Sequence, residues 1–336
     1  MADRVKNTRP RADGDTSAED IRLAKYYKNP EFGEVKEPAT VLDRDGRIML
    51  WHLPRIYSLC RVVGLFSSSS FSSIEFRSQG VLNMATISLR RPLDSFMKSL
   101  DADTTVWRHS LFDPPSGGGL FGAGVLNFSP GWFQQSHDVS FPCWWFVVLF
   151  IYSCLLKQLS EQLYVSSDIR TESAGDFLHM TASLDVLSDA ITALVAPQQY
   201  DYGLATMIHL KAGDHLHQWH PVIDHWHSSW SGSSIIVNRK TPFHRDSGAA
   251  PSEYDLLFSG GTHTKCSFEV RELGLKLPYL PGSVVALTGK VLRHGVDSWE
   301  GGERICHARF VKDSIRDRMG QPRPDWVCHE DYFDSV

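Results

Sequence analysis

The alternation of apolar and polar residues changes character along the chain. After residue 231, short runs rich in β-branched and aromatic residues follow one another, separated by Gly, Pro or charged turns at roughly ten-residue spacing. The runs are SIIVN, YDLLFSG, CSFEV, LKLPYL, SVVALTG, KVLRHGV and RICHARFV. Such spacing is typical of an all-β sandwich or barrel. We therefore expect a β core at about residues 231–315.

Helical periodicity precedes this region. Residues 183–195 place four apolar side chains on one stripe of a helix. These are Leu184, Leu187, Ile191 and Leu194. A second helix is expected at about 199–212, and residues 89–101 also match a helical stripe. The pattern predicts helices that flank the β core.

The first half of the chain is less regular. Residues 1–38 mix charges with Pro and Gly and lack apolar periodicity, which indicates a flexible N-terminal arm. Residues 39–336 are expected to form a single domain that opens with a hairpin, because Asp45 and Gly46 separate two β-prone runs. Atypical inserts are expected at about 58–80, which is serine-rich, and at about 139–182.

The second insert contains an uncharged run, residues 141–156. A membrane-spanning helix needs about 20 apolar residues, so this run is too short. It indicates a buried element, or intron sequence translated in frame, and we expect no membrane partner.

Composition and charge narrow the class of protein. The chain has 336 residues, of which 42% are hydrophobic and 22% charged, as in a folded soluble protein. A net charge of -5 gives no support for a nucleic-acid coat protein, although it allows a local basic cleft. The six cysteines form no Cys-x-x-Cys pair, so a zinc ribbon is not indicated. The first residues lack the apolar core of a signal peptide, and we expect an intracellular protein with reduced thiols.

Candidate chemistry gathers around the HRD sequence that starts at residue 244. Residues two apart in a strand share a face at about 7 Å, so His244 and Asp246 can direct an imidazole and a carboxylate to one point. His294, at the end of another predicted strand, offers a third ligand. Two histidines and one carboxylate form the facial triad of non-haem Fe(II) oxygenases.

A basic residue in the last predicted strand supports this hypothesis. Arg304 shares one face with Cys306, Ala308 and Phe310, whereas Arg309 belongs to the opposite face. If the first face lines the barrel, Arg304 can place a guanidinium fork on a dicarboxylate cosubstrate. Arg309 is the alternative, and a surface position for Arg304 is the simpler interpretation.

Other polar clusters have weaker patterns. The histidine-rich stretch 209–227 lacks cysteines and the tight ligand spacing of zinc sites, which favours a polar helix face and loop over a second metal site. The basic tail 309–323 interleaves with aspartates, so it either follows a phosphate backbone or pairs with itself. Asn238 is either a turn residue or a hydrogen-bonding partner of a base.

Together these motifs resemble the 2-oxoglutarate/Fe(II) dioxygenases, and finer features resemble the TET/JBP branch, especially its compact fungal members. The segments that carry the resemblance are TVLDRDGRIMLWHLP, VLNFSPGWFQQSHD, IIVNRKTPFHRD, YDLLFSGG, LPYLPGSVVALTGKVLRHGV and RICHARFVKD. The resemblance implies an α+β fold with a mainly β core. That core would be a double-stranded β-helix of the jelly-roll, cupin-like kind, flanked by helices.

The resemblance also implies an activity. Fe(II) would be held by His244, Asp246 and His294, with 2-oxoglutarate on Arg304 and O2 as the oxidant. The substrate would be the methyl group of 5-methylcytosine, or of a related methylated base in DNA, flipped out of the duplex to reach the iron. Asn238 and Arg239 would line the substrate mouth.

A DNA substrate implies a nuclear location, and no obligate protein partner is indicated. Two alternatives stay open. The same machinery could act on N6-methyladenine, RNA, a protein side chain or a small molecule, because the triad is common to all of these. The chain could also be an inactive β-barrel module that binds DNA or another partner.

Overall fold

The structure is a computed structural model that carries no ligand. It describes residues 33–54, 92, 93, 95, 123–133, 162–170, 172–213, 216, 220–246 and 248–333. The insert expected at 58–80, the run 141–156 and most of the helix expected at 89–101 lie outside these residues.

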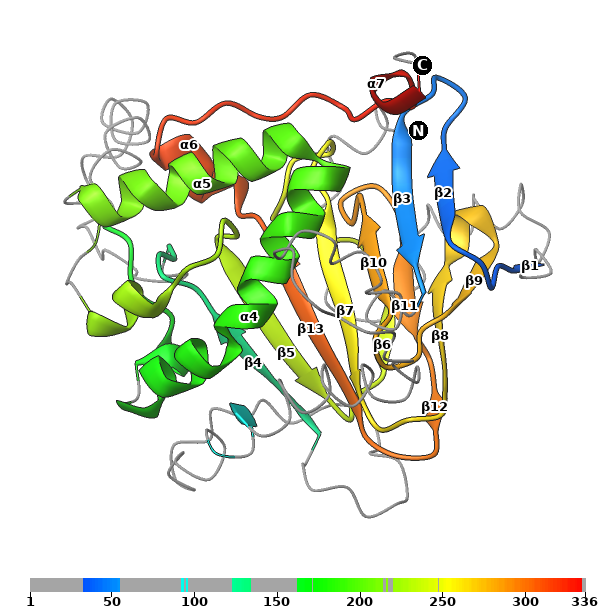
Figure 1. The fold of residues 1–336 in the computed structure, drawn as a ribbon, viewed down its shortest axis with the longest axis horizontal. Helices are drawn as coiled ribbons and strands as arrows, with labels where there is room; N and C mark the ends of the chain where they lie inside the picture. The colour runs from blue at the N-terminus through cyan, green and yellow to red at the C-terminus, as the bar shows by residue number, and fades with distance from the viewer. Residues whose placement is uncertain are drawn as a thin grey trace, which may run out of the picture.

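Within the described residues, the larger of two β-sheets has seven strands in the order β2-β3-β10-β7-β13-β5-β4, and all neighbouring strands are antiparallel. Its strands are β2 (Ala39–Leu42), β3 (Ile48–Leu53), β4 (Gly124–Phe128), β5 (Gly232–Val237), β7 (Asp255–Gly261), β10 (Val284–Leu287) and β13 (Arg304–Phe310). The middle of the sheet therefore comes from the β-rich runs after residue 231, and the N-terminal hairpin extends one edge (Figure 1).

The smaller sheet has the order β1-β9-β8-β11-β6, and β12 also pairs with β8. Its strands are β1 (Gly33–Glu34), β6 (Thr241–His244), β8 (Lys265–Val270), β9 (Leu275–Pro278), β11 (His294–Val296) and β12 (Trp299–Glu300). The short β1 runs parallel to β9, so the end of the segment expected to be a flexible arm takes part in this sheet. Strands β6 and β11 are neighbours in this sheet. β6 ends with His244, the first residue of the HRD sequence, and β11 begins with His294.

The two sheets face each other across an apolar layer. Residues of the larger sheet such as Leu257, Val285 and Leu287 pack there against Phe268 and Leu277 of the smaller sheet. The alternate residues along the same strands of the larger sheet face the other way. Two facing sheets of mainly antiparallel strands form the predicted double-stranded β-helix, flanked by helices.

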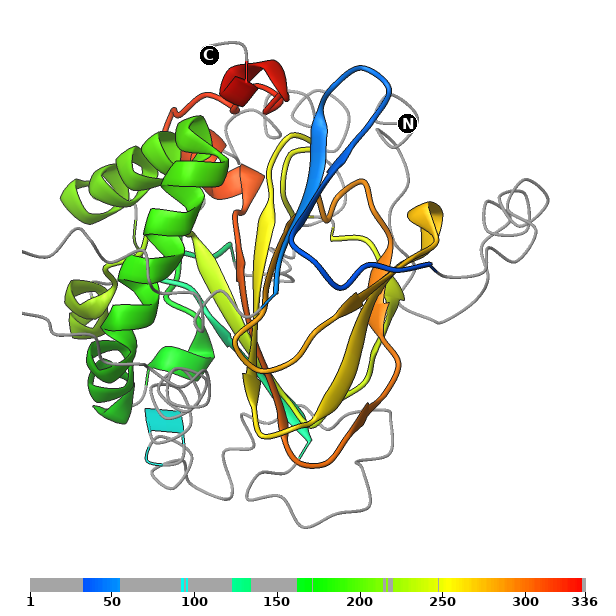
Figure 2. The ribbon, with the colours of Figure 1, turned by 45° about the vertical axis from the view of Figure 1, so that its right-hand side comes forward.

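Helices cover the outer face of the larger sheet, as Figure 2 shows for α4 and α5. The helices are α4 (Glu172–Val195), α5 (Pro197–Ala212), α6 (Asp313–Arg318) and α7 (Glu330–Phe333), with 3-10 turns η2 (Ser167–Ile169), η3 (Pro221–His225) and η4 (Arg271–Leu273). The α4 contacts include Phe177 and Leu184 against the strand residues Leu126 and Ile235. The helices predicted at 183–195 and 199–212 are confirmed, and α4 begins earlier than the stripe at 183–195 predicted.

The buried stripe of α4 differs from the predicted one at its C-terminal end. Leu184 and Ile191 are buried, but Leu194 is 73% exposed and Val195 is buried in its place. The prediction for Leu194 was wrong because the 3.6-residue period of the helix turns that position away from the sheet.

Among the described residues, α4 is the one helix long and apolar enough, over Ser173–Val195, to cross a membrane by length and composition alone. In the structure, α4 packs against the outer face of the larger sheet. Buried Asp185 forms an ion pair with Arg309 of β13, and the hydroxyl of Ser188 donates to the Leu184 carbonyl.

The predicted N-terminal hairpin is confirmed. Strands β2 and β3 pair antiparallel around a turn in which Gly46 has a φ of 77°. The Oδ1 of Asp43 accepts the backbone N–H groups of Asp45 at 2.9 Å and Arg47 at 3.0 Å. Because a side-chain carboxylate satisfies the turn and glycine supplies the left-handed residue, the local sequence determines this hairpin.

Candidate metal centre

The three predicted metal ligands converge at one end of the smaller sheet. His244 is the last residue of β6, His294 is the first residue of β11, and the two are paired directly across the antiparallel ladder. Asp246 follows β6 by two residues. Within the described part of the chain, these three residues form the one cluster of His, Cys, Asp and Glu that could hold a metal ion, with one ligand atom from each lying within 4.8 Å of the others.

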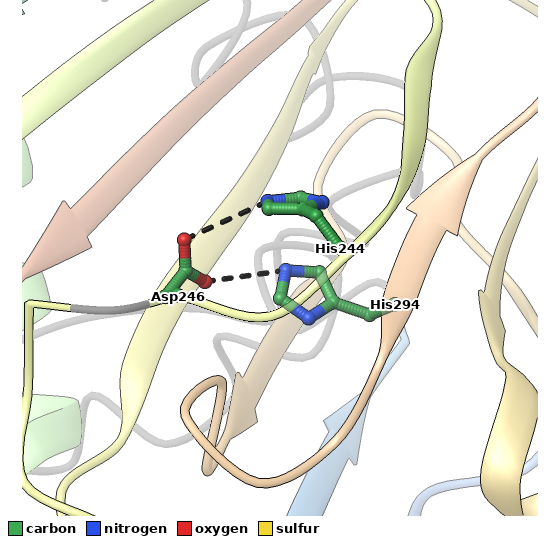
Figure 3. Close-up of side chains that lie close together, drawn as sticks. All are labelled: His244, Asp246 and His294. Atoms are coloured by element: carbon green, nitrogen blue, oxygen red, sulfur yellow. Dashed lines mark ion pairs between the residues drawn. The ribbon is translucent and has the colours of Figure 1, made fainter. Parts of the chain in front are cut away.

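Both imidazoles are directed at the carboxylate (Figure 3). The Nε2 of His244 lies 3.6 Å from Asp246 Oδ1, and the Nε2 of His294 lies 3.4 Å from Asp246 Oδ2. The two imidazole rings are 4.5 Å apart between centroids, and Phe268 of β8 stacks on His294 at 5.5 Å. The three groups therefore enclose one point from three directions.

The backbone fixes which nitrogen of each histidine is free. The Nδ1 of His244 is 2.9 Å from the carbonyl oxygen of Pro242, and the Nδ1 of His294 is 3.1 Å from that of Leu292. A carbonyl only accepts, so each Nδ1 carries a proton and each Nε2 is the nitrogen available to a metal. Histidines oriented in this way by a second hydrogen bond are typical of metal ligands.

The route by which Asp246 reaches this point differs from the prediction. Strand alternation was expected to place His244 and Asp246 on one face, but β6 ends at His244 and Asp246 lies in the following loop. Its backbone N–H donates to the carbonyl of Gly289 at 3.0 Å. A contact with the loop between β10 and β11 thus positions the carboxylate. His294 also begins its strand, where the sequence suggested an end.

The electrostatics favour a neutral His294 and an ionised Asp246, whereas the pKa of His244 is raised, because the hydrogen bond and charge of Asp246 outweigh its burial. Burial, together with the charge of His244, lowers the pKa of His294 to about 4. Burial acts to raise the pKa of Asp246, but the hydrogen bond from His244 and the two histidine charges hold it below its usual range. Metal binding needs free imidazole lone pairs and an ionised carboxylate.

The site is open on one side. The side chains of His244 and Asp246 are 40% and 38% exposed, whereas that of His294 is 4% exposed. His294 thus lies on the buried side of the site, where it packs against Phe268. A substrate can approach from the exposed side, which His244 and Asp246 form.

Sequence reasoning missed Asp255, which lies against Asp246 at the start of β7. Its carboxyl is fully buried, and burial together with the Asp246 charge raises its pKa well above the usual value. In the sequence, Asp255 appeared only as the polar start of an apolar strand, and no motif marked it. Its position depends on the meeting of β7 with the loop that carries Asp246.

Arg304 faces the interior between the two sheets, as the face alternation predicted. It is 2% exposed, its Nη1 donates to the carbonyl of Arg239 at 2.7 Å, and its Nε has no hydrogen-bond partner among the residues described. The adjacent groups are Cys266, Cys306 and Tyr279, whose pKa values burial raises, so all three are neutral. This guanidinium has no carboxylate partner in an ion pair among the described residues.

Arg309 has a different partner. Its side chain lies on the helix side of the larger sheet and forms a buried ion pair with Asp185 of α4. Arg309 therefore stabilises the contact between sheet and helix and does not face the interior that holds Arg304.

The two residues predicted at the substrate mouth have contrasting environments. Asn238 adopts a left-handed backbone with a φ of 46°, and its Oδ1 accepts the backbone N–H of Arg304 at 3.0 Å. This geometry supports its interpretation as a turn residue. Arg239 is half-buried, and its Nε lacks a hydrogen-bond partner among the described residues. Burial and the charge of Arg304 lower its pKa.

The structure explains the histidine-rich stretch 209–227 in part, and it explains the basic tail 309–323. His220 accepts the Val222 N–H as the cap of η3, and His215 and His217 lie outside the described residues. In the basic tail, Arg316 pairs with Glu253 and Asp313, and Arg323 pairs with Asp313 and Asp317. Arg316 and Arg323 therefore pair within the tail, as one interpretation predicted, although Arg316 is buried and not on a solvated face.

Comparison with known proteins agrees with this geometry. The family Tet_JBP, described as the oxygenase domain of the 2OGFeDO superfamily, matches residues 162–313. No curated protein matches the chain. Among solved structures, NgTET1 in complex with 5mC DNA is similar over 88% of this chain and 89% of its own, with 12% identity and a TM-score of 0.46.

A second solved structure is an oxidoreductase of the 2OG-Fe(II) oxygenase family from Burkholderia pseudomallei. It is similar over 78% of this chain and 100% of its own, with 12% identity and a TM-score of 0.24. The span matched by the family contains His244, Asp246 and His294 of the metal site and the buried Arg304. Residues 162–313 of this chain therefore match the TET/JBP oxygenase domain of the 2-oxoglutarate/Fe(II) dioxygenase superfamily.

Proposed function

We propose that this protein uses Fe(II), 2-oxoglutarate and O2 to oxidise the methyl group of 5-methylcytosine, or of a related methylated base, in DNA. The observation that carries the proposal is the convergence of His244, Asp246 and His294 within 4.8 Å, in the sandwich that also buries Arg304. Membership of the superfamily implies Fe(II) and 2-oxoglutarate.

The donor set fits Fe(II). Two imidazole nitrogens and one carboxylate oxygen are the facial ligands of non-haem iron, which leave open coordination positions for a chelating cosubstrate and O2. When bound, the iron with 2-oxoglutarate and O2 supplies the oxidant that hydroxylates a C–H bond, and the cosubstrate leaves as succinate and CO2. The protein directs both Nε2 atoms and the ionised Asp246 at one point before the metal arrives.

Arg304 suits the far carboxylate of the cosubstrate. Its Nε is buried without a partner among the described residues, and a buried cation without a counter-ion is costly. A carboxylate that binds the guanidinium fork would remove this cost and would be oriented by it. Neutral Tyr279, Cys266 and Cys306 beside Arg304 add no competing negative charge.

The substrate would enter on the open side of the site. A methyl group on a stacked base cannot reach His244 and Asp246, so the nucleotide would have to leave the duplex. Arg239 lies close to Arg304, and its Nε has no partner in the described part of the chain, so we assign it to the mouth of this entrance. Asn238 would support the mouth through its bond to the Arg304 backbone.

The test measures succinate release with Fe(II) and 2-oxoglutarate on three DNA duplexes of one sequence. One carries 5-methylcytosine, one carries N6-methyladenine and one is unmodified. We expect the 5-methylcytosine duplex to stimulate succinate release, with hydroxymethylcytosine as the product in mass spectrometry. The Asp246→Ala variant is the matched control and is expected to release no succinate, because it lacks the carboxylate ligand.

Two results would overturn the proposal in different ways. Stimulation by N6-methyladenine alone would assign the chemistry to another base. If the intact protein forms no complex with Fe(II) and 2-oxoglutarate under anaerobic conditions, it is a binding module and not an enzyme. A substrate in chromosomal DNA also implies a nuclear location, which fluorescence microscopy of the tagged full-length chain would test.

A further inference from the structure

Arg245, the residue between the metal ligands His244 and Asp246, links two separate segments of the chain. Its Nε donates to the carbonyl of Val291 at 2.9 Å, and its Nη2 donates to Glu272 Oε1 at 2.8 Å. The Arg245 side chain is 17% exposed and that of Glu272 is 3% exposed. This is a largely buried, charge-assisted contact with two bonds from one guanidinium, which is more directional than an exposed pair.

The second oxygen of Glu272 extends the link to the segment that carries His294. Glu272 Oε2 accepts the backbone N–H of Arg293 at 2.8 Å, and the Arg293 carbonyl accepts the N–H of Arg271 at 3.0 Å. The Leu292 carbonyl in the same segment orients the His294 ring. The backbone of each residue from 291 to 293 therefore has a hydrogen-bond partner. Val291 binds Arg245, Leu292 binds the His294 ring, and Arg293 binds Glu272 and Arg271 of η4.

The other bonds between the two halves of the site are weaker or lie elsewhere. The ladder between β6 and β11 pairs His294 with His244, but its register shifts before Val296. The Asp246 N–H donates to Gly289, and the Arg293 side chain reaches the carbonyl of Phe243 at a long 3.5 Å. A metal site needs its ligands placed within about 0.5 Å, which a short irregular ladder does not secure by itself.

We propose that Arg245 and Glu272 are positioning residues that hold the segment of His244 and Asp246 against the segment of His294, and so set the geometry of the metal site. Neither residue belongs to the cluster of three metal ligands. The inference rests on the proposed function, because it assumes that the three ligands bind one ion. It assigns to this chain a specific contact that determines how well they do so.

Cobalt(II) is a suitable probe, because its visible absorption reports ligand geometry and its titration gives a dissociation constant without turnover. Arg245→Lys keeps the charge but cannot make both bonds, since an ammonium is a point donor and not a fork. Glu272→Gln keeps the shape but replaces one acceptor oxygen with a donor. We expect each variant to bind Co(II) about 10-fold to 100-fold more weakly, with a changed spectrum, as for other residues that support metal ligands.

Arg309→Lys provides the control, because it weakens another buried arginine–carboxylate pair, on the helix side of the larger sheet. We expect it to lower the Tm while the Co(II) dissociation constant and spectrum stay those of the wild type. The double variant Arg245→Lys/Glu272→Gln should lose less affinity for Co(II) than the two single variants together, because both changes break the shared Arg245–Glu272 contact. Arg245→Ala would extend the series if it folds, and the proposal does not depend on it.

The outcomes separate this inference from the function on which it rests. Tight Co(II) binding by the wild type, with the same affinity and spectrum in Arg245→Lys and Glu272→Gln, would overturn the inference and leave the proposed function intact. A wild-type protein that binds no Co(II) would overturn both. A loss of affinity in Arg309→Lys equal to that in Arg245→Lys would show a general effect of stability, and would also overturn the positioning role.

Discussion

Gly289 and Asp246 are in direct contact in a way that requires glycine. The Gly289 carbonyl accepts the Asp246 N–H at 3.0 Å, and a Cβ built on Gly289 would lie 2.7 Å from Asp246 Oδ2. The same Cβ would clash with Asp255. Two carboxyl groups therefore fill the space beside this backbone, and the loop between β10 and β11 shapes the metal site through its lack of a side chain.

Replacement of Gly289 by alanine is expected to weaken metal binding. The added methyl group must displace Asp246 or Asp255, and a displaced ligand costs at least about 10-fold in affinity. Titration with Co(II) would measure the loss. Gly33→Ala is the control, because its Cβ would meet no atom within 4 Å. An unchanged dissociation constant in Gly289→Ala would show that the carboxylates adapt without cost.

Metal binding is expected to stabilise the folded protein. An ion that binds only the native state at 100 times its dissociation constant adds about 2.7 kcal/mol to the free energy of unfolding. For a domain of this size, the Tm should rise by about 4 °C, as measured by circular dichroism under anaerobic Fe(II). Asp246→Asn, which removes the anionic ligand, should show no such rise. A full rise in that variant would place the ion elsewhere.

Replacement of Arg304 by alanine is expected to affect cosubstrate binding, whereas replacement of Arg309 is expected to affect the stability of the fold. Arg304→Ala should raise the KM for 2-oxoglutarate at least about 30-fold, because a desolvated charge pair is lost, and high cosubstrate should partly restore turnover. The measurement is succinate release against cosubstrate concentration. A normal KM in Arg304→Ala would show that another group binds the cosubstrate.

Arg309→Ala should leave that KM unchanged and reduce the stability of the fold. Truncation of Arg309 would leave Asp185 buried without a counter-ion, at a cost of about 3–5 kcal/mol. Urea denaturation would measure this loss. If Arg309→Ala raises the KM while its stability is normal, the two arginines have the reverse roles.

Stability is expected to fall in acid through buried His307. Burial, assisted by the charge of Arg309, lowers its pKa well below the usual value, so His307 stays neutral in the folded state. The unfolded histidine takes up a proton as the pH falls below about 6.5, which favours unfolding. Between pH 7.5 and pH 5.5 this one group should cost about 1.4 kcal/mol.

Urea denaturation of the metal-free protein at the two pH values tests the contribution of His307. His307→Phe should shrink the difference in the free energy of unfolding between pH 7.5 and pH 5.5 by about the same 1.4 kcal/mol. The same substitution at exposed His227 should leave the difference unchanged. A pH dependence identical in the wild type and His307→Phe would mean that His307 titrates alike in both states.

Much of the fold and of the site could be predicted from local sequence. Asp45 and Gly46 specify the first turn, and the alternation of residues along β13 is enough to place Arg304 and Arg309 on opposite faces. His244, Asp246 and His294 could be selected by residue type and by their places at predicted strand ends. Leu194 was misplaced because a short stripe in the sequence does not fix the exact phase of a helix against its sheet.

The sequence by itself determined which residues alternate, where the chain turns and which side chains can bind a metal, because these depend on neighbours within a few positions. Only the tertiary structure decided that Asp246 reaches the site through the carbonyl of Gly289, and that Arg245 joins Glu272. It also decided that Asp255 is buried against Asp246. Such contacts join segments far apart in the chain, and their distances follow from how two sheets pack, which no local pattern encodes.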